Sequence, residues 1–588
     1  MVSNISTSQL SSESKPRDVK VVPIARETTL LRSRTWDRLK FEIEYALGKG
    51  TTANSYLIQG DKIAVLDPPG ESFTQIYLEA LQRYIDPKAI DYVILGHINP
   101  NRGETVKALL EIAPQVIFVC SNPGAIALEQ ILEQEQLPTK VIKRGDTLDL
   151  GQGHHLEFLL TPTPRWPDSL CTYDRKTSIL YTDKFFGSHV CGDQVLDEGW
   201  KVYAEDRRYY FDSLMAPYAK QVETALEKFA TKPAKLYGTG HGPLVKYGFA
   251  ELTSFYQEWV KKQRTQELSV ALLYASAYGN TATLGQAIAN GITKAGVAVE
   301  SINCESAEPD EIKAAVEKCA GFIMGSPTLG GHAPTQIQTA LGIVLSTADK
   351  TKLAGVFGSF GWSGEAIDLL EQKFKDGGYR FGFDTIRVKF KPTDVVLKTC
   401  EEAGTDFAQA LKKARKRAQA AAKKTAGKTA QKADRTEQAL GRIIGSLCIV
   451  TTKQGDLAGG MLASWVSQAT FNPPGLTVAV AKDRAVESLL HSGNSFVLNI
   501  LEEGKHLGMM KHFLKPFGPG EDRFSEIETD TTEKGNPILK DALAYIECSV
   551  ENRMECGDHW LIYGVAKEGN LLGEGITAVH HRKSGSHY

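Results

Sequence analysis

Long apolar runs are missing from this sequence. No uninterrupted apolar stretch approaches the roughly 20 residues that a membrane-spanning helix needs, and the Ser-rich, charged start at 1–20 lacks the apolar segment of a secretion signal. Cysteines are few: 9 are scattered along the chain, an odd number, with no CxxC pair. This pattern disfavours a cysteine-ligated metal and is typical of a reducing compartment, so we expect a cytoplasmic protein with no membrane span.

An excess of positive charge is also missing. The 68 Lys and Arg and 70 Asp and Glu residues give a net charge of −2, which does not favour binding to nucleic acid or an anionic membrane. The one basic stretch, 412–435, carries no interleaved aromatic residues for base stacking. We interpret it as a solvated helix end that runs into a linker, and a nucleic-acid contact is the less favoured alternative.

The 588 residues, 42% hydrophobic and 23% charged, predict a soluble chain of roughly three or four domains. After an N-terminal extension, 1–35, strands at 62–67, 91–97 and 115–120 alternate with helices in a first unit at 36–260. Strands and helices alternate again in 268–412, which predicts a parallel sheet between helices. A basic linker, 413–436, leads to 437–588, where short β-rich segments predict a small barrel or sandwich.

Three loops of the second unit follow predicted strands at regular intervals. The first is rich in hydroxyl groups and precedes a helix, whose N-terminus suits a phosphate; no Walker lysine follows, so a nucleoside triphosphate is disfavoured. The loops lie together at the carboxyl ends of a parallel sheet, where ligands bind. We predict that they hold flavin mononucleotide (FMN), with Trp362 available to stack on a flat ring. The predicted cofactor-binding residues are Ser276, Ala277, Tyr278, Gly279, Asn280, Thr281, Ser326, Pro327, Thr328, Leu329, Gly330, Gly361, Trp362, Ser363 and Gly364.

With these loops, 268–412 resembles flavodoxin. The segments NSYLI (54–58), AVLDPP, ILGHINPNRGE, RWPDS (165–169), YTDKFFG (181–187) and GTGHGP (238–243) make 36–260 resemble the metallo-β-lactamase-like αββα domain of flavodiiron proteins, which precedes a flavodoxin-like domain in that family. The resemblance implies a doubly wound parallel sheet with FMN in the second unit and a diiron-type pocket in the first.

The iron ligands of the family do not carry over to this chain. Its H-x-E-x-D-H motif falls on His97, Asn99, Asn101 and Arg102, and its remaining ligand positions fall on Arg165, Lys184 and His241. Only His97 and His241 keep the family's residue type, and we expect them to be hydrogen-bonded remnants. We therefore predict no metal ligand and no diiron centre.

Electrostatics supports this prediction. Two unit charges 4 Å apart interact by about 4 kcal/mol at an effective dielectric of 20, and a divalent iron facing Arg102 or Lys184 roughly doubles that penalty. Asp183 is not expected to replace Lys184, because neighbouring strand residues point to opposite faces, and Glu104 alone is not expected to rebuild the site. We expect the cations to pair with local acids such as Asp168; binding of a small anion such as chloride is the alternative.

The last unit resembles the flavin reductase-like split β-barrel. The segment SWVSQAT (464–470) followed by NPP, the GDH segment at 557–559 and the C-terminal HHRKSGSHY carry this resemblance. It implies a second flavin, with His559 as the catalytic residue facing flavin and nicotinamide. The predicted flavin-binding residues are Ser464, Trp465, Ser467, Gln468 and Arg582.

The whole chain resembles the cyanobacterial flavodiiron proteins with a fused reductase domain, in the subgroup with a degenerate metal pocket. That resemblance implies an oxidoreductase that passes electrons from NAD(P)H, or another photosynthetic donor, through flavin toward reduction of oxygen to water. It also implies a head-to-tail dimer or higher oligomer, with itself or with an iron-competent paralogue that supplies the oxygen site. Two alternatives remain: an NAD(P)H:flavin reductase acting alone, and a non-catalytic regulatory subunit.

Overall fold

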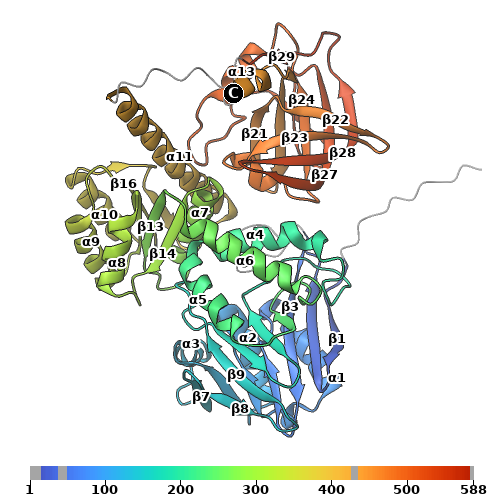
Figure 1. Ribbon diagram of the computed structural model, residues 1–588, viewed down its shortest axis with the longest axis vertical. Helices are drawn as coiled ribbons and strands as arrows, with labels where there is room; N and C mark the ends of the chain where they lie inside the picture. Colours follow the sequence, from blue (N-terminus) through green and yellow to red (C-terminus); the bar gives the residue numbers. More distant parts are fainter. Residues whose placement is uncertain (1–14, 38–48, 426–434, 583–588) are drawn as a thin grey trace, which may run out of the picture. The chain divides into compact units, whose positions relative to one another are not determined.

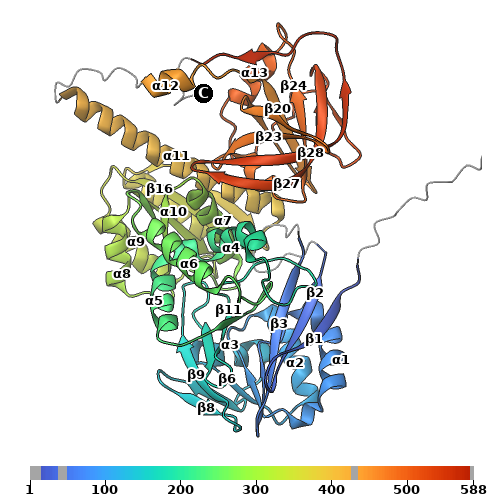
Figure 2. The same ribbon diagram turned by 45° about the vertical axis from the view of Figure 1, so that its right-hand side comes forward.

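The computed structural model describes residues 15–37, 49–425 and 435–582. Two compact units divide the chain, 1–211 with 220–258, and 212–219 with 259–588. Figures 1 and 2 show the elements of each unit from two directions. None of the helices in the described ranges is long and apolar enough to cross a membrane.

The first unit contains two sheets that share a core. The seven-stranded sheet runs in sequence order through β1 (Asp18–Ala25), β2 (Thr28–Thr35), β3 (Thr51–Gln59), β4 (Ile63–Leu66), β5 (Tyr92–Ile94), β6 (Ile117–Ser121) and β7 (Thr139–Ile142). The five-stranded sheet has the order β12 (Leu236–Thr239), β11 (Ile179–Asp183), β10 (Leu170–Asp174), β9 (His155–Leu160) and β8 (Thr147–Asp149). Apolar side chains of both sheets, such as Leu30 and Leu156, form one buried cluster.

Helices cover the outer faces of these sheets. The seven-stranded sheet packs on its other side against α1 (Thr74–Tyr84), α2 (Pro100–Ile112) and α3 (Asn122–Leu132). Next to the second sheet, Phe186 contacts Phe229 of α5 (Ala219–Ala230) and Tyr256 of α6 (Phe249–Arg264); α4 spans Ala204–Leu214. The helix–sheet–sheet–helix order confirms the predicted αββα architecture.

The structure corrects the prediction that 1–35 is an extension separate from the first unit. Residues 18–35 form β1 and β2, and β2 pairs with β3 along its whole length. Apolar residues such as Leu30 and Leu31 are fully buried in β2, one in each of the two cores that the sheet separates. The two strands are joined by a turn at 26–27. The hairpin was not predicted because a Ser-rich, polar segment precedes it.

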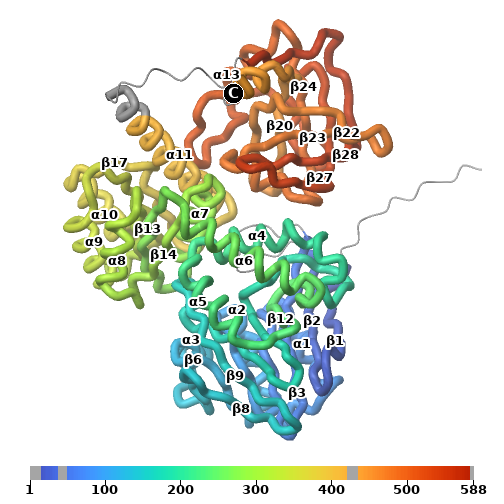
Figure 3. Tube along the Cα trace, in the orientation of Figure 1, coloured from blue at the N-terminus to red at the C-terminus, as the bar shows by residue number. Residues whose placement is uncertain are grey.

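The second unit contains a parallel sheet of the order β14 (Ala298–Asn303), β13 (Ser269–Tyr274), β15 (Gly321–Pro327), β16 (Leu353–Phe360) and β17 (Arg380–Phe381), with β18 (Ile386–Lys389) also on β16. One face packs against α8 (Pro309–Lys318), α9 (Thr335–Thr347) and α10 (Glu365–Asp376). The other packs against α7 (Asn280–Lys294) and α11 (Asp394–Thr425) (Figure 3). This confirms the doubly wound sheet.

The predicted boundary at 412 does not coincide with the end of a secondary-structure element. Helix α11 begins at Asp394 and runs through 413–425, so the first half of the predicted basic linker is helical. Ala, Lys and Arg favour a helix, which explains why α11 extends beyond its packed part. The segment 426–434 lies outside the described residues, and α12 (Arg435–Leu440) follows it.

The C-terminal part forms an antiparallel seven-stranded sheet. Its order is β21 (Leu457–Ala463), β20 (Cys448–Gln454), β24 (Ser495–Ile500), β27 (Ala544–Cys556), β28 (His559–Leu571), β23 (Pro474–Ala481) and β22 (Val466–Phe471). Two short strand pairs and one helix flank this sheet. The pairs are β19 (Gly445–Ser446) with β29 (Val579–His580) and β25 (Thr529–Thr531) with β26 (Pro537–Leu539), and the helix is α13 (Leu507–Leu514). Its buried residues, including Val450, Val478 and Ile562, form one core, as expected for the split barrel.

We expect Leu31→Ala to destabilise the first unit by about 2–5 kcal/mol, because it opens a cavity in a core where Leu31 is fully buried. Calorimetry of the full-length protein measures the shift of the corresponding unfolding transition. Ile126→Ala serves as the control, since Ile126 is 52% exposed on α3. Equal transitions in both variants would contradict a structural role for the β1–β2 hairpin.

Candidate functional site

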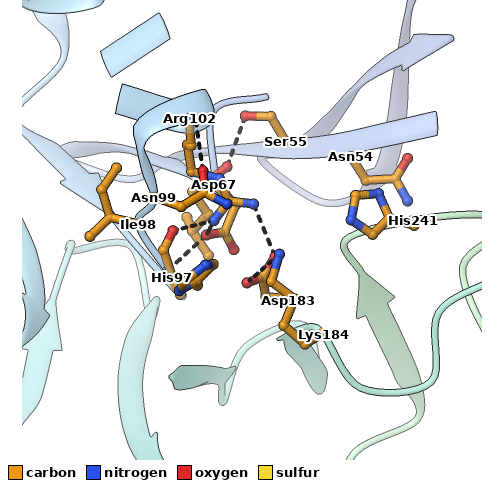
Figure 4. Close-up of polar contacts among 12 residues, drawn as sticks. Asn54, Ser55, Asp67, His97, Ile98, Asn99, Arg102, Asp183, Lys184 and His241 are labelled. Atoms are coloured by element: carbon orange, nitrogen blue, oxygen red, sulfur yellow. Dashed lines mark hydrogen bonds and ion pairs between the residues drawn. The ribbon is translucent and has the colours of Figure 1, made fainter. Parts of the chain in front are cut away.

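A buried ion cluster surrounds Arg102 in the first unit, at the positions where the family resemblance places iron ligands (Figure 4). The guanidinium of Arg102 donates to Asp67 and to Asp183, each at 3.1 Å, and to the carbonyl oxygen of His97 at 2.5 Å. Lys184 is fully buried, and its ammonium lies 3.7 Å from the Asp183 carboxylate. We call Arg102, Asp67, Asp183 and Lys184 the Arg102 cluster.

Backbone geometry explains how two carboxylates reach one guanidinium. Asp67 follows β4 and Asp183 ends β11, and both have positive φ values, 52° and 43°. The left-handed region is one that Asp tolerates better than most residues. The chain therefore turns at Asp67 and at Asp183, and the alternation of side chains between faces does not extend through Asp183 and Lys184. The expectation that Asp183 does not replace Lys184 as an iron ligand stays a prediction, but the alternation of faces given as its reason does not hold at these two residues.

The two retained histidines are hydrogen-bonded, as expected. His97 Nδ1 lies 2.7 Å from Asp168 Oδ1, and the other Asp168 oxygen accepts the Ile98 N–H at 2.8 Å. Burial alone would raise the pKa of Asp168, but the charge and hydrogen bond of His97 and the Ile98 N–H hold that pKa below its ordinary value. His241 Nδ1 lies 2.7 Å from the carbonyl oxygen of Thr52.

The remaining positions of the motif have local partners. Asn99 caps α2 by accepting the Arg102 N–H at 2.9 Å, and the Asn101 amide lies 3.5 Å from Glu71. The guanidinium of Arg165 lies 5.6 Å from the centre of the Trp166 ring. Glu104 is exposed on α2. Among residues 15–37, 49–425 and 435–582, no group of three or more His, Cys, Asp or Glu residues is arranged to hold a metal ion.

These contacts revise the expected electrostatics of the pocket. Arg102 and Lys184 pair with acids, as predicted, and Arg165 lies over the Trp166 ring. The acid named in the prediction, Asp168, pairs with His97, while Asp67 and Asp183 contact Arg102. Sequence reasoning missed Asp67, although its position at the end of a buried strand, in AVLDPP, is a signal for a residue at the sheet edge. The pocket is thus a paired cluster of both signs, and its carboxylates already hold a cation.

The three predicted flavin loops meet at one edge of the parallel sheet of the second unit. Thr281 Oγ1, in the first turn of α7, lies 2.8 Å from Ser359 Oγ at the end of β16. The Thr328 N–H donates to the Ser359 carbonyl oxygen at 3.1 Å, which joins the second loop to the third. Ser276 Oγ accepts the Ala282 N–H at 3.0 Å. The structure therefore brings together all three loops named from the sequence.

Several features of these loops fit a bound flavin. Gly279 and Gly330 have positive φ values, 80° and 56°, and a Cβ at either would have no described atom within 4 Å. Thr328 Oγ1 is buried and has no hydrogen-bond partner among the described residues. Tyr278 and Trp362 are 87% and 89% exposed, which is unusual for aromatic side chains beside a glycine-rich loop. An aromatic ring system and a phosphate would use these surfaces and donors.

Trp465 is the centre of the predicted reductase site. Its ring lies 5.0 Å from the His559 ring, and the Arg582 guanidinium lies 5.0 Å from the Trp465 ring centre. His559 Nδ1 contacts Asp558 at 2.7 Å. Ser464 Oγ instead lies 3.2 Å from His580, and Ser467 and Gln468 are exposed on β22. Of the predicted C-terminal segment, 583–588 lies outside the described residues.

Comparisons with known proteins agree with this arrangement of modules. Three family models match: an ODP family beta lactamase over 51–242, a flavodoxin over 272–404 and a flavin reductase like domain over 440–584. The fold and sites thus define a flavin-binding electron-transfer protein. In its sequence, a β-lactamase-like domain is followed by a flavodoxin domain and a flavin reductase domain.

Full-length relatives are found in cyanobacteria. A Nostoc sp. (strain PCC 7120) protein provisionally named diflavin flavoprotein A 6 is 69% identical over 578 residues, which cover 98% of this chain and 100% of the relative. Diflavin flavoprotein A 1 of Synechocystis sp. (strain PCC 6803) is 44% identical over 96% of this chain and 97% of its own length. The metal-soaked Flv1 flavodiiron core from Synechocystis sp. PCC6803 is 65% identical, with a TM-score of 0.67, and covers 68% of this chain and 100% of that structure. The chain belongs to the diflavin flavoprotein A family of flavodiiron proteins, which are oxidoreductases.

We expect Arg102→Met to destabilise the first unit by about 3–5 kcal/mol, because it leaves Asp67 and Asp183 buried without their shared cation. Thermal or urea unfolding of the full-length protein measures the loss. Lys107→Met, at an exposed position of the same helix, is the matched control. A loss no larger than that of the control would show that the cluster is not a stabilising ion pair.

Stability should also depend on pH through Asp67. Burial raises the pKa of Asp67 from 3.8 to about 7, with the charge of Asp183 acting in the same direction and that of Arg102 opposing it. Because the native state binds this proton more tightly than the unfolded chain, the contribution of Asp67 to the free energy of unfolding is fully present below pH 3.8 and is lost as pH rises through about 7.

The corresponding test compares the pH dependence of unfolding midpoints between about pH 5 and 8. Asp67→Asn should lose stability less steeply than the unsubstituted protein as pH rises, because the amide does not titrate. Asp61→Asn, at an exposed position, should keep the original slope. A slope that Asp67→Asn leaves unchanged would contradict the assignment.

Proposed function

We propose that this chain passes electrons from NAD(P)H, or from another photosynthetic donor, through two flavins toward the reduction of oxygen to water. An iron-containing paralogue supplies the oxygen site in a head-to-tail dimer or higher oligomer, in the cytoplasm. The observation that carries the proposal is the Arg102 guanidinium between Asp67 and Asp183. The buried carboxylates of this pocket already hold a cation, so the pocket is unsuited to a pair of iron ions, and the proposed role is electron transfer.

In this proposal FMN, when bound, supplies reversible acceptance of one or two electrons. The hydroxyl groups of Ser276 and Thr281 and the N-terminus of α7 hold its phosphate, where the helix presents donors and positive partial charge. Thr328 Oγ1 would form a hydrogen bond with the bound cofactor, and the exposed side chains of Trp362 and Tyr278 would be available to its ring system.

At the reductase site, Trp465 and His559 form a surface for a second flavin and the nicotinamide. Asp558 fixes one nitrogen of the His559 ring, and Arg582 places a guanidinium beside Trp465 for a phosphate group. This site orients the donor relative to the flavin, while the reactive group belongs to the cofactor.

The proposal is tested by the composition and activity of the isolated protein. We expect iron near zero and flavin approaching about two per chain, because Arg102 already pairs with the buried carboxylates and the proposal assigns a flavin to each of two modules. NAD(P)H should bleach the flavin absorption band, and oxygen consumption should stay slow until an iron-competent paralogue is added. Fast four-electron oxygen reduction by the chain alone, or a stoichiometric iron pair, would overturn the proposal.

His559→Asn provides the site-directed arm of this test. Loss of the ring beside Trp465 should slow flavin bleaching by roughly tenfold or more, since reacting groups tolerate little misplacement. His155→Asn, at an exposed position of β9, is the control. High activity toward added free flavin would indicate a reductase acting alone, and absence of both flavin and bleaching would indicate a regulatory subunit; either result would replace the proposal.

A further inference from the structure

Five charged side chains, three buried and two half-buried, form a network in the second unit, outside the sites described above. They are Lys294 at the end of α7, Lys398 and Glu401 on α11, Glu487 in the 3-10 turn Ala485–Leu489, and Arg553 on β27. Their side chains are between 1% and 16% exposed. Lys294 and Glu401 belong to the flavodoxin-like module, and Glu487 and Arg553 belong to the reductase-like module.

The network alternates in sign across the two modules. Lys294 forms ion pairs with Glu401 and, at 3.5 Å, with Glu487. Lys398 lies 3.2 Å from Glu401 and donates at 2.6 Å to the carbonyl oxygen of Ala485. Glu487 in turn pairs with Arg553. Each charge therefore has a partner of opposite sign, which buried ions require.

Further contacts of α11 surround this network. Glu402 accepts the Gly520 N–H at 2.9 Å, and the Arg523 guanidinium lies 3.4 Å from it. Gln409 donates to the Asp483 carboxylate at 3.1 Å. Lys398, Glu402 and Gln409 thus bond to two segments of the reductase-like module, 483–485 and 520–523, and these contacts together fix its orientation on α11.

The network extends to the proposed nicotinamide site. The Arg553 guanidinium lies 4.3 Å from the centre of the Trp560 ring, within the range of a cation–π contact. Trp560 directly follows His559, whose ring lies 5.0 Å from that of Trp465. At the other end, Lys294 belongs to α7, and α7 begins at Asn280 in the first flavin loop. Helix α7 therefore joins the first flavin loop to Glu487, which in turn pairs with Arg553 on the β27–β28 hairpin.

Stability alone is a weak explanation for these charges. Apolar residues of similar size often replace buried ion pairs at no cost in stability, whereas ion pairs of defined geometry specify one arrangement of the groups around them. The stack of Arg553 on Trp560 is such a geometric contact, because the planar guanidinium presents a face as well as donors.

We propose that Lys294, Glu487 and Arg553 are positioning residues that seat the reductase-like module on α7 and α11 and thereby place the Trp560–His559 end of β28 at the nicotinamide site. The effect on electron transfer rests on the proposed function, whereas the seating of the module does not.

Lys294→Met in the full-length, flavin-loaded protein tests the seating. Backbone amides of 485–491 and 553–560 should exchange hydrogen about tenfold faster or more, because Glu487 loses one of its two cations. Lys318→Met is the matched control, since Lys318 is an exposed last-turn lysine on α8. Lys294→Arg, which keeps the charge, should restore protection. Exchange equal to that of the control would overturn the proposal.

Arg553→Lys tests the positioning even if Lys294→Met does not fold. The ammonium keeps the charge that Glu487 needs but has no planar face for Trp560. The limiting rate of flavin bleaching by NAD(P)H should fall about tenfold, with the half-saturating NAD(P)H concentration and the flavin content changed less than twofold. An unchanged limiting rate would overturn the positioning role. If the unsubstituted protein shows no bleaching, the proposed function fails, while hydrogen exchange still decides the seating.

Discussion

The pairing of Arg102 with Asp67 and Asp183 is the interaction on which the first unit depends. Three secondary-structure elements meet there: Asp67 follows β4, Arg102 lies on α2 and Asp183 ends β11. A buried cation needs partners, and here two carboxylates reach it because Asp67 and Asp183 both have left-handed backbone conformations. The cluster links the two sheets of the unit at the place where the family resemblance locates metal ligands.

The three candidate sites differ in how far their polar groups are satisfied. In the Arg102 cluster, cations and carboxylates pair with one another and are buried. In the flavodoxin-like module, Thr328 Oγ1 is buried without a hydrogen-bond partner among the described residues, and Tyr278 and Trp362 are exposed. The reductase-like module lies between these cases: Trp465 contacts both His559 and Arg582, whereas Ser467 and Gln468 are exposed. This contrast supports flavin chemistry and gives no support to metal chemistry.

Much of the fold and of the candidate flavin sites could be predicted from the sequence, because these features depend on local patterns. The apolar strands of the parallel sheet and the hydroxyl-rich and glycine-rich loops after them lie close together by the geometry of any parallel sheet. The three loops and the contact between Trp465 and His559 follow from such patterns and from the family resemblance. The loss of the family's iron-ligand residue types could also be predicted, since it concerns residue identity alone.

The remainder depends on long-range contacts. Asp67 and Arg102 are 35 residues apart and Arg102 and Asp183 are 81 apart, and no periodicity relates them. The positive φ of Asp183 reverses the side-chain direction that a regular strand predicts. The β1–β2 hairpin was missed because a polar, Ser-rich start precedes it, and the ion network of Lys294 because its members come from four separate elements.

The position of β2 has a consequence for shortened forms of this protein. The family match to the first unit begins at residue 51, which is also the first residue of β3. A chain cut there would keep every strand that the match covers, yet β3 would lose the partner that pairs with all of Thr51–Ile58. The exposed row of peptide groups, on a strand whose side chains are buried on both faces, is a template for intermolecular strand pairing, so a fragment chosen from the match alone would be prone to aggregation.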